Sequence, residues 1–238
     1  AATAWEPPRS HRPQPAHSHT CGMTAEESGD SRTLPVVETF HSLQGEGIHS
    51  GRSALFIRLG GCSVGCSWCD TKHSWPKDVH PQVSLQALQQ KAQGAVAEGA
   101  AFVVITGGEP LEHHLAPLCE ALKPIGVPLH LETSGVGELT GAFAWITLSP
   151  KPHRLPEPQV LVACHELKVV VHEASDLAFA EAMATAAAQG RSSDQPTPAL
   201  LLQPGWQSAT GQELAIDYVR SHPNWRLSLQ SHKWLGVR

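Results

Sequence analysis

Three cysteines in one short segment, Cys62, Cys66 and Cys69, are the residues whose type and spacing point most clearly to chemistry. The spacing C-x3-C-x2-C supplies three thiolates, whereas a closed structural zinc site and an ordinary ferredoxin cluster each take four protein ligands. Three thiolates on a four-iron cluster leave one iron open to a ligand from outside the protein. Neighbouring glycines let the backbone wrap closely and donate amide hydrogen bonds to cluster sulfurs. The segment therefore favours a 4Fe–4S cluster.

The cysteine spacing alone leaves a zinc site as the alternative. His73 lies shortly after Cys69 and could complete a Cys3His site. Such a chain would be a zinc-stabilised binding module without enzymatic activity. The other cysteines offer no competing pattern, because Cys119 fits the apolar face of a helix and Cys164 fits a loop, so both are interpreted as structural.

Composition and charge exclude several classes of function. A chain of 238 residues, 41% hydrophobic and 16% charged, is typical of one globular domain with a sizeable core. The formal net charge of -5 provides no basic surface for a phosphate backbone, so we expect no nucleic-acid partner. No apolar run approaches the length of a membrane span, and the N-terminus lacks a signal-peptide pattern. We expect a cytoplasmic protein with reduced thiols, in which a cysteine cluster indicates a metal site.

Alternating strand and helix patterns must position these cysteines. Apolar runs rich in β-branched residues predict strands over residues 35–40, 54–59, 102–106, 128–132, 145–148, 167–171, 200–203 and 226–230. Helical periodicity predicts one helix after an N-cap at Ser84, and others over 115–123, 176–189 and 211–222. The alternation predicts a parallel α/β sheet or barrel. Glycine and polar residues repeatedly follow the strands, where α/β barrels build their active sites.

The chain divides at about residue 33. Residues 1–33 are rich in proline and histidine and lack an apolar period, so we expect a disordered N-terminal tail. Residues 34–238 carry the regular pattern of strands and helices. They are expected to fold as one domain that holds the site.

Two motifs resemble those of the radical S-adenosylmethionine superfamily. The first is C-x3-C-x-aromatic-C, with Trp68 as the aromatic residue, and the second is Gly107-Gly108-Glu109-Pro110 after a predicted strand. The resemblance implies that residues 34–238 are a catalytic domain in which the open iron binds the amino and carboxylate groups of S-adenosylmethionine. Reduction of such a cluster cleaves the sulfonium and gives a 5′-deoxyadenosyl radical.

Further motifs narrow the resemblance to the 7-carboxy-7-deazaguanine synthase family. They lie at residues 40–47, 56–58, 69–71, 106–110, 132–135, 149–151, 166–170, 203–204 and 222–233. The resemblance implies an α/β fold that is an abbreviated, partial (β/α) barrel of the radical S-adenosylmethionine type. It implies a lyase that rearranges 6-carboxy-5,6,7,8-tetrahydropterin into 7-carboxy-7-deazaguanine, losing ammonia, in queuosine and related deazapurine biosynthesis. It also implies magnesium as a cofactor, a homodimer, and flavodoxin or ferredoxin as electron donor.

The same resemblance assigns roles to individual residues. Those expected to bind the substrate are Leu43, Gln44, Gly45, Glu46, Arg58, Thr106 and His232. Those expected to bind S-adenosylmethionine are Trp68, Gly108, Glu109, Ser149, Pro150, Lys151, Gln203, Pro204, Gly205 and Trp206. Thr71 is expected to ligate magnesium through its hydroxyl, with Asp70 beside it.

Several of these residues have alternative interpretations. Gln44 and Glu46 offer an amide and a carboxylate to a pterin edge, although a plain turn would use the same residues. Arg58 interrupts an apolar strand and could pair either with the substrate carboxylate or in a structural salt bridge. Lys168 also interrupts an apolar strand and is given no role, and the C-terminal sequence argues against a substrate contact by Arg238.

An enzyme that generates a glycyl radical in a partner protein is the rival radical enzyme.

Overall fold

The computed structural model describes residues 32–238, which contain one nine-stranded sheet. The strands follow the order β3-β1-β2-β4-β5-β6-β7-β8-β9. Those from β2 to β9 run parallel, and β1 is antiparallel to both of its neighbours. Their bounds are β1 Thr33–Leu43, β2 Ser53–Leu59, β3 Gln82–Ser84, β4 Val103–Gly107, β5 Leu129–Thr133, β6 Trp145–Leu148, β7 Glu166–Val171, β8 Ala199–Pro204 and β9 Trp225–Leu227.

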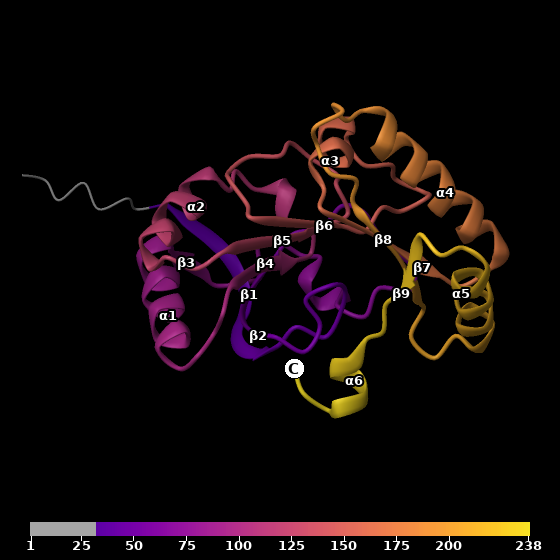
Figure 1. Ribbon diagram of the computed structural model, residues 1–238. Coiled ribbons are helices and arrows are strands. Elements are labelled where there is room, and N and C mark those ends of the chain that lie inside the picture. Colours follow the sequence, from indigo (N-terminus) through magenta and orange to yellow (C-terminus); the bar gives the residue numbers. More distant parts are fainter. Residues whose placement is uncertain (1–31) are drawn as a thin grey trace, which may run out of the picture.

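The sheet curves into an arc with helices along its outer side (Figure 1). These helices are α1 Leu85–Ala97, α2 Ala116–Leu122, α3 Pro158–Ala163, α4 Ala174–Gln189 and α5 Ala209–Ser221. Short 3-10 helices occur at Lys72–Ser74, Pro110–Glu112 and Lys123–Ile125. Helix α6 (Ser231–Leu235) lies on the inner side, near the C-terminus. The edge strands β3 and β9 are not neighbours in the described sheet, so the barrel stays open. The expected partial barrel is therefore confirmed.

Each of the predicted strands corresponds to a strand of the sheet, and all but two have bounds within one residue of the prediction at each end. β1 continues to Leu43, which pairs with Ser53 of β2, and β9 ends at Leu227 rather than at residue 230. The sequence did not reveal β3, α3 or α6, because segments this short show no period. Of the expected tail, only Arg32 and Thr33 lie among the described residues, and Thr33 already belongs to β1.

A hydrophobic core fills the space between the sheet and the outer helices. Leu88 of α1 and Leu118 of α2 are fully buried there, together with Ile105 of β4. Cys119 and Cys164 are buried in the same cluster, which confirms their structural interpretation. Between residues 32 and 238, no helix has the length and apolar character needed to cross a membrane. The opposite face of the sheet holds a smaller apolar cluster of Ala54, Phe56, Phe102 and Val104, and polar residues lie on that face toward the carboxyl ends of the strands.

Replacing Leu118 with alanine is expected to lower the free energy of unfolding by about 2–5 kcal/mol, because it leaves a cavity at a fully buried position. Leu155→Ala is the matched control, because it removes the same atoms from a side chain that is 61% exposed. That control should change the free energy by less than about 0.5 kcal/mol. Urea denaturation followed by circular dichroism measures both, and equal losses would contradict the placement of Leu118.

Candidate active site

Two adjoining cavities lie on the inner side of the sheet, at the carboxyl ends of the parallel strands. The first has a volume of about 340 Å³ and the second of about 430 Å³. The wall between them is lined on both sides by Glu46, Thr71, Thr106, Glu132, Gln230 and Lys233. The loops that follow separate strands therefore meet in one site, as predicted.

The three clustered cysteines all line the first cavity as free thiols. Their segment is anchored at its start, where Cys62 N donates a hydrogen bond to Trp75 O at 3.1 Å. Burial raises the pKa of Cys62 and Cys66, and the Lys151 ammonium partly opposes this at Cys66. Binding to iron removes the thiol proton, so three thiols facing one cavity are suitable ligands for a cluster.

The structure argues against the zinc alternative. His73, the fourth ligand of that site, is exposed and lines neither cavity. Within residues 32–238, no three His, Cys, Asp or Glu side chains are grouped to hold one metal ion. A zinc ion needs each thiolate sulfur about 2.3 Å from a single centre, which would require such a group. Thiolates of an iron–sulfur cluster bind separate irons and so lie farther apart.

Two glycines at the end of β4 allow close backbone contacts, Gly107 with the end of β2 and Gly108 with the start of the cysteine segment. A Cβ on Gly107 would fall 2.3 Å from Leu59 O, and its φ of +143° favours glycine. A Cβ on Gly108 would fall 2.2 Å from Gly61 O. The backbone N–H of Glu109 donates to the same Gly61 oxygen at 2.8 Å. A side chain at either glycine would push the contacting segments apart and open the first cavity.

The Glu109 side chain lines neither cavity, and the expected contact of this residue with S-adenosylmethionine stays a prediction. The residue is 1% exposed, and its carboxylate accepts hydrogen bonds from Leu111 N at 3.0 Å and Ser134 N at 2.8 Å. The hydroxyls of Thr133 and Ser134 donate to it as well. Burial raises the pKa of Glu109, and these hydrogen bonds oppose the rise. The side chain ties the loops after β4 and β5 together.

Most other residues expected to bind S-adenosylmethionine surround the first cavity. They are Trp68, Gly108, Ser149, Lys151, Gln203, Gly205 and Trp206. Lys151 Nζ donates to the carbonyl and hydroxyl oxygens of Ser149, both at 2.8 Å. Burial lowers the pKa of Lys151, against the opposing influence of Cys66. Pro150 and Pro204 line neither cavity, and their expected contacts stay predictions.

The residues expected to bind the substrate line the second cavity. Leu43, Gln44, Gly45, Arg58 and His232 face it, and Glu46 and Thr106 lie on the shared wall. A Cβ on Gly45 would fall 2.1 Å from His232 Nδ1, so only glycine lets α6 approach the loop after β1. His232 thus reaches the cavity from a helix that the sequence did not reveal.

Arg58 takes part in the structural salt bridge that was its alternative interpretation. Its Nε donates to Glu38 Oε1 at 2.9 Å, and the second Glu38 oxygen lies 3.1 Å from Arg238 Nη1. Both arginines also line the second cavity. The C-terminal residue therefore reaches this cavity, and whether Arg238 contacts the substrate stays a prediction. Glu38 holds two guanidinium groups at one wall of the cavity.

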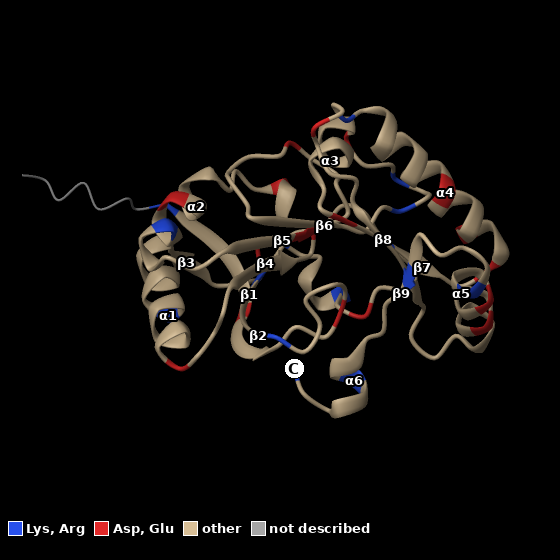
Figure 2. Cartoon of the chain, in the orientation of Figure 1, with Lys and Arg blue, Asp and Glu red and all other residues tan. Residues whose placement is uncertain are grey.

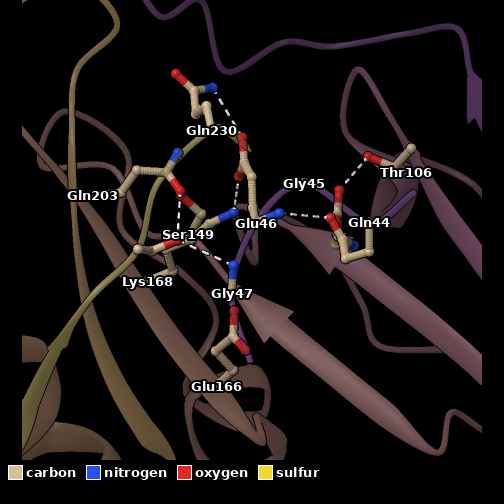
Figure 3. Close-up of polar contacts among 12 residues, drawn as sticks. Gln44, Gly45, Glu46, Gly47, Thr106, Ser149, Glu166, Lys168, Gln203 and Gln230 are labelled. Carbon is tan, nitrogen blue, oxygen red and sulfur yellow. Dashed lines mark hydrogen bonds and ion pairs between the residues drawn. The ribbon is translucent and has the colours of Figure 1, made fainter. Parts of the chain in front are cut away.

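Three residues without a predicted role, Glu132, Lys168 and Gln230, bond to side chains of the shared wall, and Figure 3 labels Lys168 and Gln230. Glu132 accepts from Gln44 Nε2 at 2.8 Å and from Thr106 Oγ1 at 3.0 Å. Lys168 forms an ion pair with Glu46, and Gln230 Nε2 donates to the other Glu46 oxygen at 2.9 Å. In the sequence, two of these residues could have been noticed because Glu132 and Lys168 place a charge within strands that are mostly apolar. Such a charge shows that a partner is required, but it does not identify the partner.

Charged residues occur on the strands inside the arc as well as on the outer helices (Figure 2). Burial disfavours the charged form of Glu46, but Lys168 and two hydrogen bonds outweigh burial and lower the pKa of Glu46 to about 2. Burial likewise acts against the Lys168 ammonium, and three nearby carboxylates, Glu46, Glu132 and Glu166, raise its pKa overall. Both members of the pair are therefore charged at neutral pH.

Comparison with known proteins places this site in a family. A sequence model described as the radical SAM superfamily matches residues 56–138. A 7-carboxy-7-deazaguanine synthase from Prochlorococcus marinus is 53% identical over 223 residues, which cover 87% of this chain and 99% of that protein. The enzyme of the same name from Escherichia coli K12 is 38% identical over 226 residues, covering 85% of this chain and 98% of that protein. The crystal structure of QueE from Escherichia coli matches with a TM-score of 0.73 at 34% identity, covering 87% of this chain and 100% of that chain.

These likenesses agree with the open barrel and with the cysteine segment at its first cavity. They extend over the whole described sheet rather than over one motif, so they exclude the zinc-binding module and the glycyl-radical enzyme. The chain belongs to the 7-carboxy-7-deazaguanine synthase family of radical S-adenosylmethionine enzymes.

Proposed function

We propose that this enzyme converts 6-carboxy-5,6,7,8-tetrahydropterin into 7-carboxy-7-deazaguanine with loss of ammonia, in queuosine and related deazapurine biosynthesis. The observation that carries the proposal is the division of the site into two cavities. Residues expected for S-adenosylmethionine line the first, and residues expected for the substrate line the second. Ligands held in the two cavities would meet across the wall that Glu46 and Thr106 line.

The first cavity suits a 4Fe–4S cluster on Cys62, Cys66 and Cys69 with S-adenosylmethionine beside it. When bound and reduced, this pair supplies a radical that takes a hydrogen atom from the substrate. The chain contributes position and shielding from water. Lys151, already fixed on Ser149, presents a buried ammonium to the carboxylate group of S-adenosylmethionine.

The second cavity suits a pterin that carries a carboxylate. Arg58 uses its Nε on Glu38, which leaves its terminal nitrogens to grip the substrate carboxylate in a planar fork. Glu132 holds the Gln44 amide in place, so Gln44 and the Glu46 carboxylate present fixed polar groups to the ring. Orienting the ring in this way is the main contribution a protein makes to a radical rearrangement.

Thr71 is the proposed ligand of magnesium. Its hydroxyl lies 3.5 Å from Cys69 Sγ, and the residue lines both cavities. A metal ion on this hydroxyl would reach the substrate side of the wall, with the Asp70 carboxylate next to it in the chain. Magnesium takes few protein ligands and completes its shell with water or substrate oxygens, so one threonine is sufficient.

Membership of the family supports three further proposals about the enzyme at work. It acts as a homodimer, it receives electrons from flavodoxin or ferredoxin, and it does so in the cytoplasm. A reducing compartment keeps the three cluster thiols available for iron. The donor must be a low-potential carrier, because the cluster has to be reduced before the radical forms.

The function is tested with protein purified anaerobically, reconstituted with iron and sulfide, and supplied with dithionite, S-adenosylmethionine and 6-carboxytetrahydropterin. We expect 7-carboxy-7-deazaguanine by mass spectrometry. Cys66→Ala should abolish the product, because the cluster loses a ligand, whereas Cys119→Ala, a buried cysteine outside both cavities, should retain it. Formation of 5′-deoxyadenosine without the deazaguanine would contradict the proposed substrate.

Arg58→Gln is expected to raise the KM for the carboxylated pterin by about tenfold or more, the loss typical of a charge-assisted hydrogen bond. Binding of tetrahydropterin without the carboxylate should stay unchanged, which makes that analogue the control. Glu38 keeps Arg238 as a partner in the variant, so the wall retains one ion pair. An equal loss for both pterins would mean that Arg58 supports the cavity without binding the carboxylate.

Thr71→Val is expected to raise the magnesium concentration needed for half-maximal activity by about tenfold, because valine keeps the shape and removes the ligand oxygen. Thr71→Ser keeps that oxygen and serves as the control. Activity titrated against magnesium chloride in both variants gives the comparison. An unchanged requirement in the valine variant would move the metal to another ligand.

A further inference from the structure

Lys168 is a buried charged residue to which neither the sequence nor the family assigns a role. It lies in the middle of β7, between Leu167 and Val169, and is 5% exposed. Its ammonium lines the first cavity and not the second, whereas its partner Glu46 lines both. The ion pair therefore spans the wall between the two ligands.

A lone ammonium at this depth would strongly oppose folding, so its retention needs a partner that is always charged. The neighbouring carboxylates are already occupied. Glu166 accepts from Ile48 N at 2.9 Å, and Glu132 accepts from Gln44 and Thr106. Glu46 is thus the carboxylate to which Lys168 bonds directly.

We propose that Lys168 is a positioning residue for recognition of the pterin: its ion pair holds the Glu46 carboxylate at the wall as an ionised hydrogen-bond acceptor. This rests on the proposed function, because the pterin ring offers N–H donors to such an acceptor. A protonated Glu46 would keep one carbonyl acceptor but present an O–H donor at its other oxygen, which would weaken the contact with those N–H groups. Lys168 therefore acts on the substrate through Glu46.

The charges around Glu46 show why Lys168 decides its protonation. Glu132, Glu166, Lys151 and His232 also face this region, from β5, β7, the loop after β6 and α6. The two glutamates would raise the pKa of Glu46 if left unopposed. Gln230 is neutral and only donates a hydrogen bond. Without Lys168, burial and the like charges would favour the protonated acid near neutral pH.

The test measures binding alone, with the cluster oxidised and no reductant present, so that no turnover occurs. Dissociation constants for 6-carboxytetrahydropterin and for S-adenosylmethionine are obtained anaerobically by equilibrium dialysis. The variants are Lys168→Met, which removes the charge and keeps the length, and Lys168→Arg, which keeps the charge. Lys123→Met, an exposed lysine outside both cavities, is the control.

Lys168→Met is expected to weaken pterin binding by about tenfold or more at neutral pH while the affinity for S-adenosylmethionine stays unchanged. Lys168→Arg and the control should bind as the parent enzyme does. The pKa of Glu46 in the parent is about 2, so its ionisation makes no contribution to pH dependence above about pH 6. The Lys168→Met variant should regain affinity as the pH rises to about 9, because Glu46 then ionises.

The double variant Glu46→Gln/Lys168→Met removes both buried charges and covers the case in which a single variant does not fold. Glu46→Gln should weaken pterin binding without any recovery at high pH. The double variant Glu46→Gln/Lys168→Met should then bind no more weakly than Glu46→Gln alone, since Lys168 acts only through Glu46. Additive losses, or a loss of S-adenosylmethionine affinity in its place, would overturn the proposal. Failure of the parent enzyme to bind the pterin would instead refute the proposed function.

Discussion

Because the sheet does not close into a barrel, its inner face has a gap between β2 and β9. The rest of the structure depends on the chain segments that fill this gap. The loop between β1 and β2 and the segment after β9 fill it together. Gly47 N donates to Ser228 Oγ at 3.1 Å, and Ile48 N donates to Glu166 at 2.9 Å. The same loop carries Glu46 into the wall between the cavities. The segments that fill the gap are therefore the same ones that build the second cavity.

Filling the gap with a polar loop brings charge into the interior. Glu46, Glu132 and Glu166 face one lysine, Lys168, in a region with little access to water. Each carboxylate needs a donor there, because an unpaired buried charge is strongly unfavourable. The resulting network makes the wall both polar and rigid. Such a wall can orient a polar heterocycle and still keep bulk water away from radical chemistry.

Close backbone approach is the second requirement of the site. Gly45 meets α6 and Gly108 meets the cysteine segment at distances that no Cβ would permit. Each of the two cavities thus has a boundary that depends on a glycine contacting a part of the chain distant in sequence. The positions of these two glycines in the sequence show only that a turn is allowed there. The contacts that make glycine obligatory appear once the strands are assembled.

Local pattern determined much of this protein from the sequence alone. The strands follow from their β-branched runs, and the proposed cluster ligands Cys62, Cys66 and Cys69 lie within one segment, so their spacing alone brings them to one cavity. The tertiary structure decided what depends on pairing between distant segments. In the folded chain, the Glu109 carboxylate accepts a hydrogen bond from Ser134 N and so connects two loops. Arg238 lines the second cavity, and Lys168 pairs with Glu46. The physical reason is that a buried charge reveals its need for a partner in the sequence, while only the folded chain determines which partner comes within reach.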